Sequence, residues 1–197
     1  RTTTVTNPDG STRITENYLD GRVKSITGTG VVPEYYTYGV NADGSTWTRV
    51  DTATATSPRY TKTTFDIAGR ILREESPAFG GSTFTTEYAY DGYSRLQSQS
   101  RPGQADTLYA YDAMGDLIRS GLDIDANTQL DLASTDRITD SERIYSIEDG
   151  AWFDLNTTKV YPESNDATAV NVSTNKRRLS GFSGDLVAET LSIDVNA

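Results

Sequence analysis

The sequence predicts an all-β fold, a strip of consecutive antiparallel β-hairpins. Aromatic and β-branched residues alternate with polar ones in several runs, as in STFTTEYAY (82–90), and this pattern is typical of half-buried strands. Short segments rich in Asp, Asn and Gly separate the runs and favour tight turns. The 197 residues contain no helical period of useful length.

Composition predicts a thin core and excludes several functions. Only 35% of residues are hydrophobic, and the mean hydropathy is −0.55, which suits a sheet with solvated outer faces. The net charge of −10 argues against nucleic acid and anionic membrane surfaces as partners. Absence of histidine and cysteine excludes Ser-His-Asp and Cys-His catalysis, histidine-bound metals and disulfides. No apolar run approaches the roughly 20 residues that span a bilayer.

A short motif recurs along the chain. It consists of an aromatic residue, Asp, two variable residues, a small residue, Arg or Asp, and an aliphatic residue. The three clearest copies are TTFDIAGRIL (63–72), YAYDGYSRLQ (88–97) and YAYDAMGDLI (109–118). A shortened copy is NYLDGRVKSI (17–26), and a lengthened one is YTYGVNADGSTWT (36–48).

Each copy of the motif is interpreted as one β-hairpin. The aspartate, such as Asp91, opens a turn by accepting local backbone N–H bonds. Gly69 and Gly115 stand three residues after their aspartates, where the chain needs a left-handed conformation. Ser94 takes that place in the middle copy and weakens the match. Further hairpins are expected at 5–14, around Asn-Pro-Asp-Gly, and at 143–155, around Asp-Gly.

The recurring motif resembles that of the Rhs/YD-repeat family, directly over residues 15–120 and more loosely to residue 197. FDIAGRI (65–71) is the best single match, whereas YAYDAMGDL (109–117) has Asp116 where Arg is usual. The resemblance implies a β-strip of the kind that spirals into a hollow shell in bacterial Rhs and toxin-complex proteins, and into a related barrel in teneurins. This fragment of a longer parent would then form an arc or partial spiral.

The resemblance implies a structural role and no enzymatic activity. The expected organisation is YD-repeat hairpins at 1–120, an acidic loop insertion at 121–142, and further hairpins at 143–197. The chain would be a scaffold or shell-wall segment of a large secreted or cell-surface bacterial protein, with its targeting signal outside this fragment. Its partners would be neighbouring repeats of the parent, or copies of itself joined through β-edges.

Two other functions remain open. An adhesive module would bind carbohydrate or another chain through its aromatic face or an open β-edge. Rings that could stack on sugars belong to Tyr88, Tyr90, Tyr109 and Tyr111; the alternative is that these tyrosines pack across strands. A glycan-active enzyme working with a carboxylate pair is the third reading, although no pair stands in a recognisable active-site context.

The segment GLDIDANTQLDLASTDR (121–137) is a candidate calcium loop. Calcium prefers several oxygen ligands at alternate positions of a curled loop. Such positions hold Asp123, Asp125, Asn127, Gln129 and Asp131. Thr128 stands where an EF-hand has glycine, and Ser134 stands where it has a bidentate glutamate. Asp136, farther along, could supply that carboxylate instead. A bound calcium ion would be structural; the alternative is a solvated acidic loop.

Overall fold

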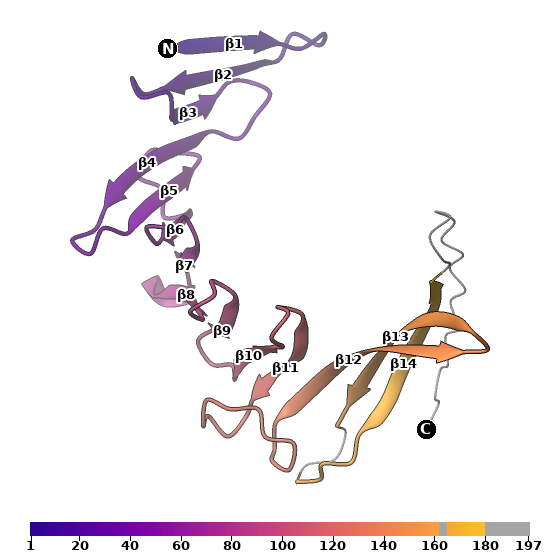
Figure 1. Cartoon of the computed structure of the whole chain (residues 1–197). Coiled ribbons are helices and arrows are strands. Elements are labelled where there is room, and N and C mark those ends of the chain that lie inside the picture. The colour runs from indigo at the N-terminus through magenta and orange to yellow at the C-terminus, as the bar shows by residue number, and fades with distance from the viewer. Residues whose placement is uncertain (162–164, 180–197) are drawn as a thin grey trace. The chain divides into compact units, whose positions relative to one another are not determined.

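A computed structural model of the chain describes residues 1–161 and 165–179. The described part is all-β: fourteen antiparallel strands form one open sheet, in which the order of strands follows the order of the chain (Figure 1). The only helical element of the described part is one 3-10 turn, Phe79–Gly81. The prediction of consecutive antiparallel hairpins is confirmed, while the arc or spiral of such a strip stays a prediction.

The chain divides into two compact units, residues 1–89 and 90–197, which are described separately. The strands that begin in the first unit are β1 (Thr2–Thr6), β2 (Thr12–Asn17), β3 (Val23–Thr27), β4 (Glu34–Val40), β5 (Thr46–Thr52), β6 (Tyr60–Phe65), β7 (Ile71–Pro77) and β8 (Thr83–Tyr90). Those of the second unit are β9 (Leu96–Ser100), β10 (Asp106–Tyr111), β11 (Leu117–Asp123), β12 (Arg137–Glu148), β13 (Ala151–Val160) and β14 (Val170–Leu179). The candidate calcium loop is the connection between β11 and β12.

One type of five-residue turn recurs in both units. The first residue donates its N–H to the carbonyl of the fifth, and the fourth donates its N–H to the carbonyl of the first. This pattern is found at 7–11, 18–22, 41–45, 66–70, 91–95 and 112–116. The fourth residue has a positive φ, which is 82° at Gly69, 96° at Gly115 and 68° at Ser94. Ser94 therefore adopts the glycine-type conformation, and the middle copy keeps the same turn as its neighbours.

The turns at 18–22 and 41–45 have the same length as the others, although their sequences suggest a shortened and a lengthened copy. Tyr18 occupies the first position, where the clearest copies have Asp. The carboxylate of Asp20, two residues later, accepts the N–H of Arg22 at 3.0 Å. In the next turn Asp43 accepts the N–H of Ser45 at 2.9 Å. A carboxylate at the third position thus organises the same turn as one at the first.

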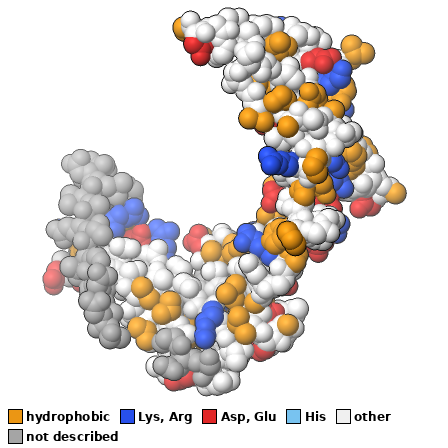
Figure 2. Space-filling model, turned by 180° about the vertical axis from the view of Figure 1, so that it is seen from behind, with side chains coloured by type: hydrophobic (Ala, Val, Ile, Leu, Met, Phe, Trp, Pro, Cys, Tyr) orange, Lys and Arg blue, Asp and Glu red, His pale blue; other side chains and the backbone are white. Residues whose placement is uncertain are grey.

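The core is thin, as the composition predicts. Among the described residues, Ile26, Ile138 and Tyr161 are the buried hydrophobic ones. Figure 2 shows hydrophobic side chains interspersed with charged ones on the surface. Buried carboxylates belong to Asp51, Asp123, Asp136 and Asp154. Polar networks therefore contribute much of the order within each unit. In residues 1–161 and 165–179, no helix has the length and apolar character needed to cross a membrane.

Candidate functional site

The Tyr-Asp-Arg set of the second unit is a turn and not an open site. Asp91 Oδ1 accepts the backbone N–H groups of Tyr93 and Arg95, each at 2.9 Å. Its other oxygen, Oδ2, accepts Arg95 Nε at 2.7 Å. Asp66 makes the equivalent bonds in the first unit, including one to Arg70 Nε at 2.6 Å. Because each carboxylate is occupied by its own turn, the aspartates have a structural role.

The arginine of this turn also contacts the next hairpin. Arg95 lies over the ring of Tyr111, with its guanidinium carbon 4.6 Å from the ring centroid, and donates to the carbonyl of Asp112 at 3.1 Å. Tyr111 in turn donates its hydroxyl to the carbonyl of Leu96 at 2.9 Å. We call this pair of contacts, an arginine on a tyrosine ring and a tyrosine hydroxyl on the carbonyl after the arginine, the hairpin lock.

A second hairpin lock lies in the first unit. The guanidinium of Arg22 lies 4.4 Å from the ring centroid of Tyr38, and the Tyr38 hydroxyl donates to the carbonyl of Val23 at 2.9 Å. Burial raises the pKa of Tyr38, as it does that of Tyr111. The hydroxyls of both locks thus stay protonated donors at neutral pH. Successive hairpins are joined by side chains in addition to strand pairing.

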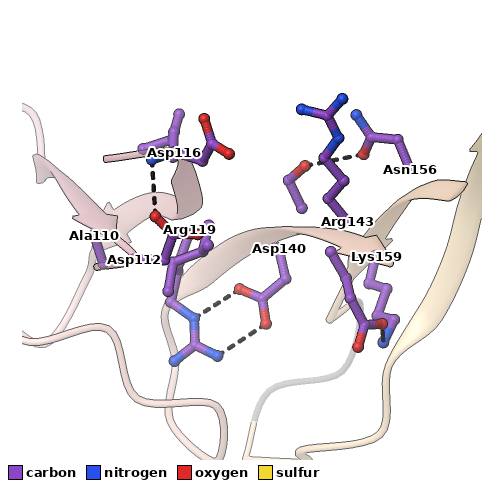
Figure 3. Close-up of a pocket in the computed structure, with 12 residues that line it drawn as sticks. Ala110, Asp112, Asp116, Arg119, Asp140, Arg143, Asn156 and Lys159 are labelled. Atoms are coloured by element: carbon purple, nitrogen blue, oxygen red, sulfur yellow. Dashed lines mark hydrogen bonds and ion pairs between the residues drawn. The ribbon is translucent and has the colours of Figure 1, made fainter. Parts of the chain in front are cut away.

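The turn at Asp112 lacks the arginine, and a cavity lies beside it. Asp112 Oδ1 accepts the N–H groups of Met114 and Asp116, each at 2.9 Å, so the backbone of the turn is preserved. Asp116 stands at the position of Arg95 and supplies no guanidinium to reach the next strand. A cavity of about 640 Å³ opens there, lined by Asp112, Asp116 and Leu117 on one side and by residues of β12 and β13 on the other (Figure 3).

Four charged side chains around this cavity form two pairs. Arg119 holds Asp140 through two bonds, Nε–Oδ1 at 2.6 Å and Nη2–Oδ2 at 2.8 Å (Figure 3). Lys159 donates to Glu142 at 2.5 Å. Tyr161 adds a hydroxyl bond of 2.8 Å to Asp140.

The four tyrosines with a proposed role in sugar stacking are half-buried. Tyr88 donates its hydroxyl to Glu74 at 2.7 Å, and Tyr111 belongs to the hairpin lock described above. Tyr90 and Tyr109 are half-buried as well. This arrangement favours cross-strand packing over an exposed row of rings, and carbohydrate contact through these residues stays a prediction.

Three carboxylates of the candidate calcium loop converge. One oxygen each of Asp123, Asp125 and Asp136 lies within 4.8 Å of the others. Asp123, at the end of β11, and Asp136, just before β12, are buried, whereas Asp125 is exposed. Two of the five predicted ligands, Asp123 and Asp125, are thus brought together, and their binding of calcium stays a prediction. Asp136, the expected substitute from farther along, completes the group.

Of the other predicted ligands, Asp131 lies outside the three-carboxylate group, whereas Asn127 contacts it, since its side-chain amide donates to Asp125 Oδ2 at 3.2 Å. The side-chain amide of Asn127 donates to Asp131 Oδ2 at 2.8 Å, which ties Asp131 to the loop. The oxygen of the same amide accepts the N–H of Gln129 at 2.8 Å. Thr128, at the place of the EF-hand glycine, has a φ of 67°, so the loop curls there without glycine.

The pKa values of two of the converging carboxylates are shifted in opposite directions. Burial raises the pKa of Asp136, but N–H groups from Asp131 and Ile124 bond to its oxygens at 3.1 and 2.8 Å and bring that pKa below its ordinary value. Desolvation, together with the negative charges of Asp136 and Asp123, raises the pKa of Asp125. The group therefore concentrates negative charge, which a divalent cation or a proton on Asp125 would relieve.

Sequence reasoning missed one ion-pair network of the second unit. Asp154 on β13 is buried and accepts Arg143 Nε at 2.9 Å and Nη2 at 2.7 Å, and Arg177 Nη2 at 2.9 Å. The Asp-Gly turn at 149–150 predicts that β12 and β13 pair, and hence that Arg143 lies near Asp154. The pairing of Arg177 with Asp154 depends on the register of β13 and β14, which no turn signal in the sequence fixes.

Comparisons with known proteins add no relative. No model of a protein family matches the sequence, and no curated protein matches it. The resemblance to the Rhs/YD-repeat family therefore depends on the recurring motif alone and stays a prediction.

Proposed function

We propose that the chain is a non-enzymatic structural segment of a large secreted or cell-surface YD-repeat protein, in which it acts as a scaffold or shell wall. The observation that carries this proposal is the hairpin lock, together with the recurring five-residue turn. The aspartates and arginines that could have formed sites are instead occupied in building each turn and joining it to the next hairpin.

The hairpin lock suits a shell wall because it adds side-chain contacts between consecutive hairpins, in addition to the pairing of their strands. A two-stranded hairpin is marginally stable alone in water, and neighbours must supply the remaining stability. Strand pairing supplies part of it. In the second unit, Arg95 and Tyr111 add a cation–π contact and a hydroxyl bond between consecutive hairpins, and such contacts favour a rigid continuous sheet.

The scaffold role is tested by disrupting the lock and measuring both order and binding. We expect Arg95→Ala to increase hydrogen exchange in β9, β10 and the turn that follows, because the contact between two hairpins is lost. A matched control is Arg101→Ala, an exposed arginine in the next loop, for which no change is expected. Unchanged exchange in Arg95→Ala would contradict the proposal that these contacts build the wall.

An adhesive module that binds carbohydrate is the alternative function. It predicts signal on a glycan array that is lost in Tyr109→Ala, a tyrosine whose hydroxyl has no hydrogen-bond partner in the described part of the chain. An array without signal, together with a protein that remains folded, would support the scaffold role. Specific binding that depends on Tyr109 would favour adhesion.

A structural calcium ion is a second part of the proposal, supported by the convergence of Asp123, Asp125 and Asp136. Calcium bound only to the folded state would stabilise the unit by about 2.7 kcal/mol at a free concentration about 100 times the Kd. The expected result is a higher melting temperature in calcium than in EDTA, lost in Asp125→Asn. Asp131→Asn is the matched control, since Asp131 lies outside the group. Equal melting curves in calcium and EDTA would contradict the calcium site.

A further inference from the structure

β12 has one long edge without a partner strand in the described part of the chain. Its pairing with β11 covers only Arg137–Asp140, whereas its pairing with β13 extends from Thr139 to Glu148. On the β11 side, the segment 141–148 therefore presents backbone N–H and C=O groups to which the described residues offer no strand. An exposed edge of this kind is a template for pairing with another strand.

The edge is open because β11 leaves β12 at the cavity described above. In the preceding turn Arg95 reaches the next hairpin, whereas Asp116 does not. Ser141, Glu142 and Arg143 of β12 line one side of the cavity, and Asp116 lines the other (Figure 3). The open edge thus begins at the cavity and runs to the Asp149-Gly150 turn of the β12–β13 hairpin.

Four large apolar side chains stand exposed beside this edge, three of them on one face of the sheet and Ile144, 48% exposed, on the other. Tyr145 is 54% exposed and Ile147 is 59% exposed, and alternation along β12 places both on the same face. Trp152, directly opposite Ile147 on β13, is 52% exposed. A cluster of this kind at a strand edge is typical of an interaction surface.

We infer that the open edge of β12 pairs with the same edge of a second copy of this chain, in an antiparallel arrangement centred on Ser146. The inference rests on the proposed scaffold role, in which strand pairing extends the sheet, and it names the edge, the partner and the register. A two-fold axis normal to the sheet relates the copies, so that one continuous sheet runs across the interface.

The residues of the edge complement themselves in this register. Tyr145 lies opposite Ile147 of the copy, and Ile147 lies opposite Tyr145 of the copy. With Trp152 beside Ile147 in each chain, the exposed apolar residues form one cluster across the axis. Because opposite residues in an antiparallel pair share a face, all of these rings and aliphatic groups are on the same side.

Charges in this register are compatible. Arg143, whose guanidinium is held by Asp154 of its own chain, lies beside the turn residue Asp149 of the copy, so that no like charges meet at either end. Glu148 lies opposite Ile144 of the copy, and its charge is already matched by Lys176 of its own chain. The segment 143–149 of each copy occupies the free edge, and the turn of each hairpin reaches the mouth of the cavity of the other.

The pairing is expected to be weak and reversible. One strand pair buries less than the roughly 1,200 Å² of a stable interface, and each chain carries a net charge of −10. Sedimentation equilibrium of the full chain should show a dimer fraction that rises with protein concentration. The dimer fraction should also rise with salt, because salt screens the net repulsion.

A cysteine placed on the axis tests the register, because the chain has no cysteine of its own. In Ser146→Cys, the two cysteines would lie directly opposite, at a Cα separation of about 4.5–5.5 Å that allows a disulfide. In the matched control, Ile144→Cys, the two cysteines would be roughly 13 Å apart along the strands and beyond disulfide reach. Mild oxidation should therefore give a covalent dimer of Ser146→Cys in several-fold excess over Ile144→Cys.

A second pair of variants keeps the test valid if the thiol of Ser146→Cys reacts poorly. Mixed Tyr145→Cys and Ile147→Cys proteins should cross-link with each other, as heterodimers identified by mass, more than either does alone.

A charge on the edge tests the interface itself. Ile147→Lys should abolish the dimer, whereas Val172→Lys, an equally charged change at a 44% exposed position of β14, should leave it.

Three results would overturn the inference. These are a chain that stays monomeric at all concentrations, equal cross-linking at positions 144 and 146, and a dimer that persists in Ile147→Lys. If the chain is a monomer and Arg95→Ala still shows the expected increase in hydrogen exchange, the dimer is refuted and the scaffold role remains supported. The two proposals therefore fail separately.

Discussion

Two turns of the second unit differ at one position. In the turn 91–95, the fifth residue is Arg95, which closes on Asp91 Oδ2 and reaches the ring of Tyr111. In the turn 112–116, the fifth residue is Asp116, which bonds to Asp112 through its backbone and not through its side chain. The backbone bonds are the same in both, yet only the first turn is joined by its side chain to the following hairpin.

The difference separates the two tasks of the motif. The aspartate and the left-handed fourth residue form the turn, while the arginine connects hairpins. Where the arginine is missing, the turn persists and a cavity of about 640 Å³ lies beside it. Strand pairing does not depend on the arginine, since β11 and β12 pair at four positions, whereas β9 and β10, beside Arg95, pair at two. An irregular repeat can thus retain its turn and its strand pairing while the fifth residue of the turn makes no contact with the next hairpin; here Arg119 and Asp140 join β11 to β12 instead.

The largest expected effect comes from removing a turn carboxylate. Asp91→Ala removes the acceptor of two N–H groups and the partner of Arg95, and leaves these donors unsatisfied. We expect the melting temperature to fall on the order of 10 °C. Asp112→Ala should cause a smaller drop, since no guanidinium is lost there. Equal drops, measured by circular dichroism, would show that Arg95 adds nothing to its turn.

The aspartate turns also predict loss of stability in acid. N–H donation by Arg95, opposed by desolvation and aided by the Arg95 guanidinium, lowers the pKa of Asp91 below its ordinary value. A carboxyl group whose pKa is lower in the folded state contributes stability above its unfolded pKa, which is about 3.9. That stability is lost as pH falls through the lower folded pKa.

Urea unfolding between pH 5 and pH 2 measures this loss. We expect the midpoint of the wild type to fall steeply below about pH 4, and that of Asp91→Asn to fall less, because an amide does not titrate. Asp112→Asn is the useful comparison, since it has the same backbone donors but no arginine. A wild-type midpoint that stays constant into strong acid would contradict the role of the turn carboxylates.

A smaller effect is expected from the hydroxyl of the hairpin lock. Tyr111→Phe removes the bond to the carbonyl of Leu96 and keeps the ring under Arg95, so the expected loss is about 1 kcal/mol of unfolding free energy. Tyr109→Phe is the matched control on the same strand, because no bond of its hydroxyl is present in the described part. If both variants lost the same free energy, the hydroxyl would have no part in joining hairpins.

Much of the fold follows from the sequence because turn chemistry is local. Asp66, Asp91 and Asp112, each with a small residue three positions later, place their turns correctly. The turn at Tyr18 is misaligned when only residue types are compared. Asp20, at its third position, accepts the N–H of the fifth residue, just as Asp66 does from the first position of its own turn. The N–H of the fifth residue is bonded in both turns, and the carboxylate that accepts it can stand at the first or the third position.

Sequence spacing predicts that Asp123 and Asp125 meet and names Asp136 as a substitute from farther along, but the reason why Asp136 joins them is not local. Asp123 and Asp125 are two residues apart and meet through the curl of the loop. Asp136 joins them because the pairing of β11 with β12 brings both ends of the loop together. Asp131 fits the spacing of a calcium loop, but its carboxylate accepts the side-chain amide of Asn127 and does not join the three-carboxylate group. Such a choice depends on side-chain contacts that spacing does not encode.

The smallest expected effect comes from restoring the missing arginine. Asp116→Arg places a guanidinium where Asp112 Oδ2 can accept it, as Asp91 Oδ2 accepts Arg95, and removes a like charge four residues from Asp112. A half-exposed pair of this kind adds only about 0.5 kcal/mol, and urea unfolding measures it. Asp116→Ala is the control, because it removes the repulsion without supplying the guanidinium. A gain in Asp116→Arg no larger than in Asp116→Ala would mean that the arginine needs a tyrosine on the next hairpin, as Arg95 has in Tyr111, and that the lock is a property of the pair.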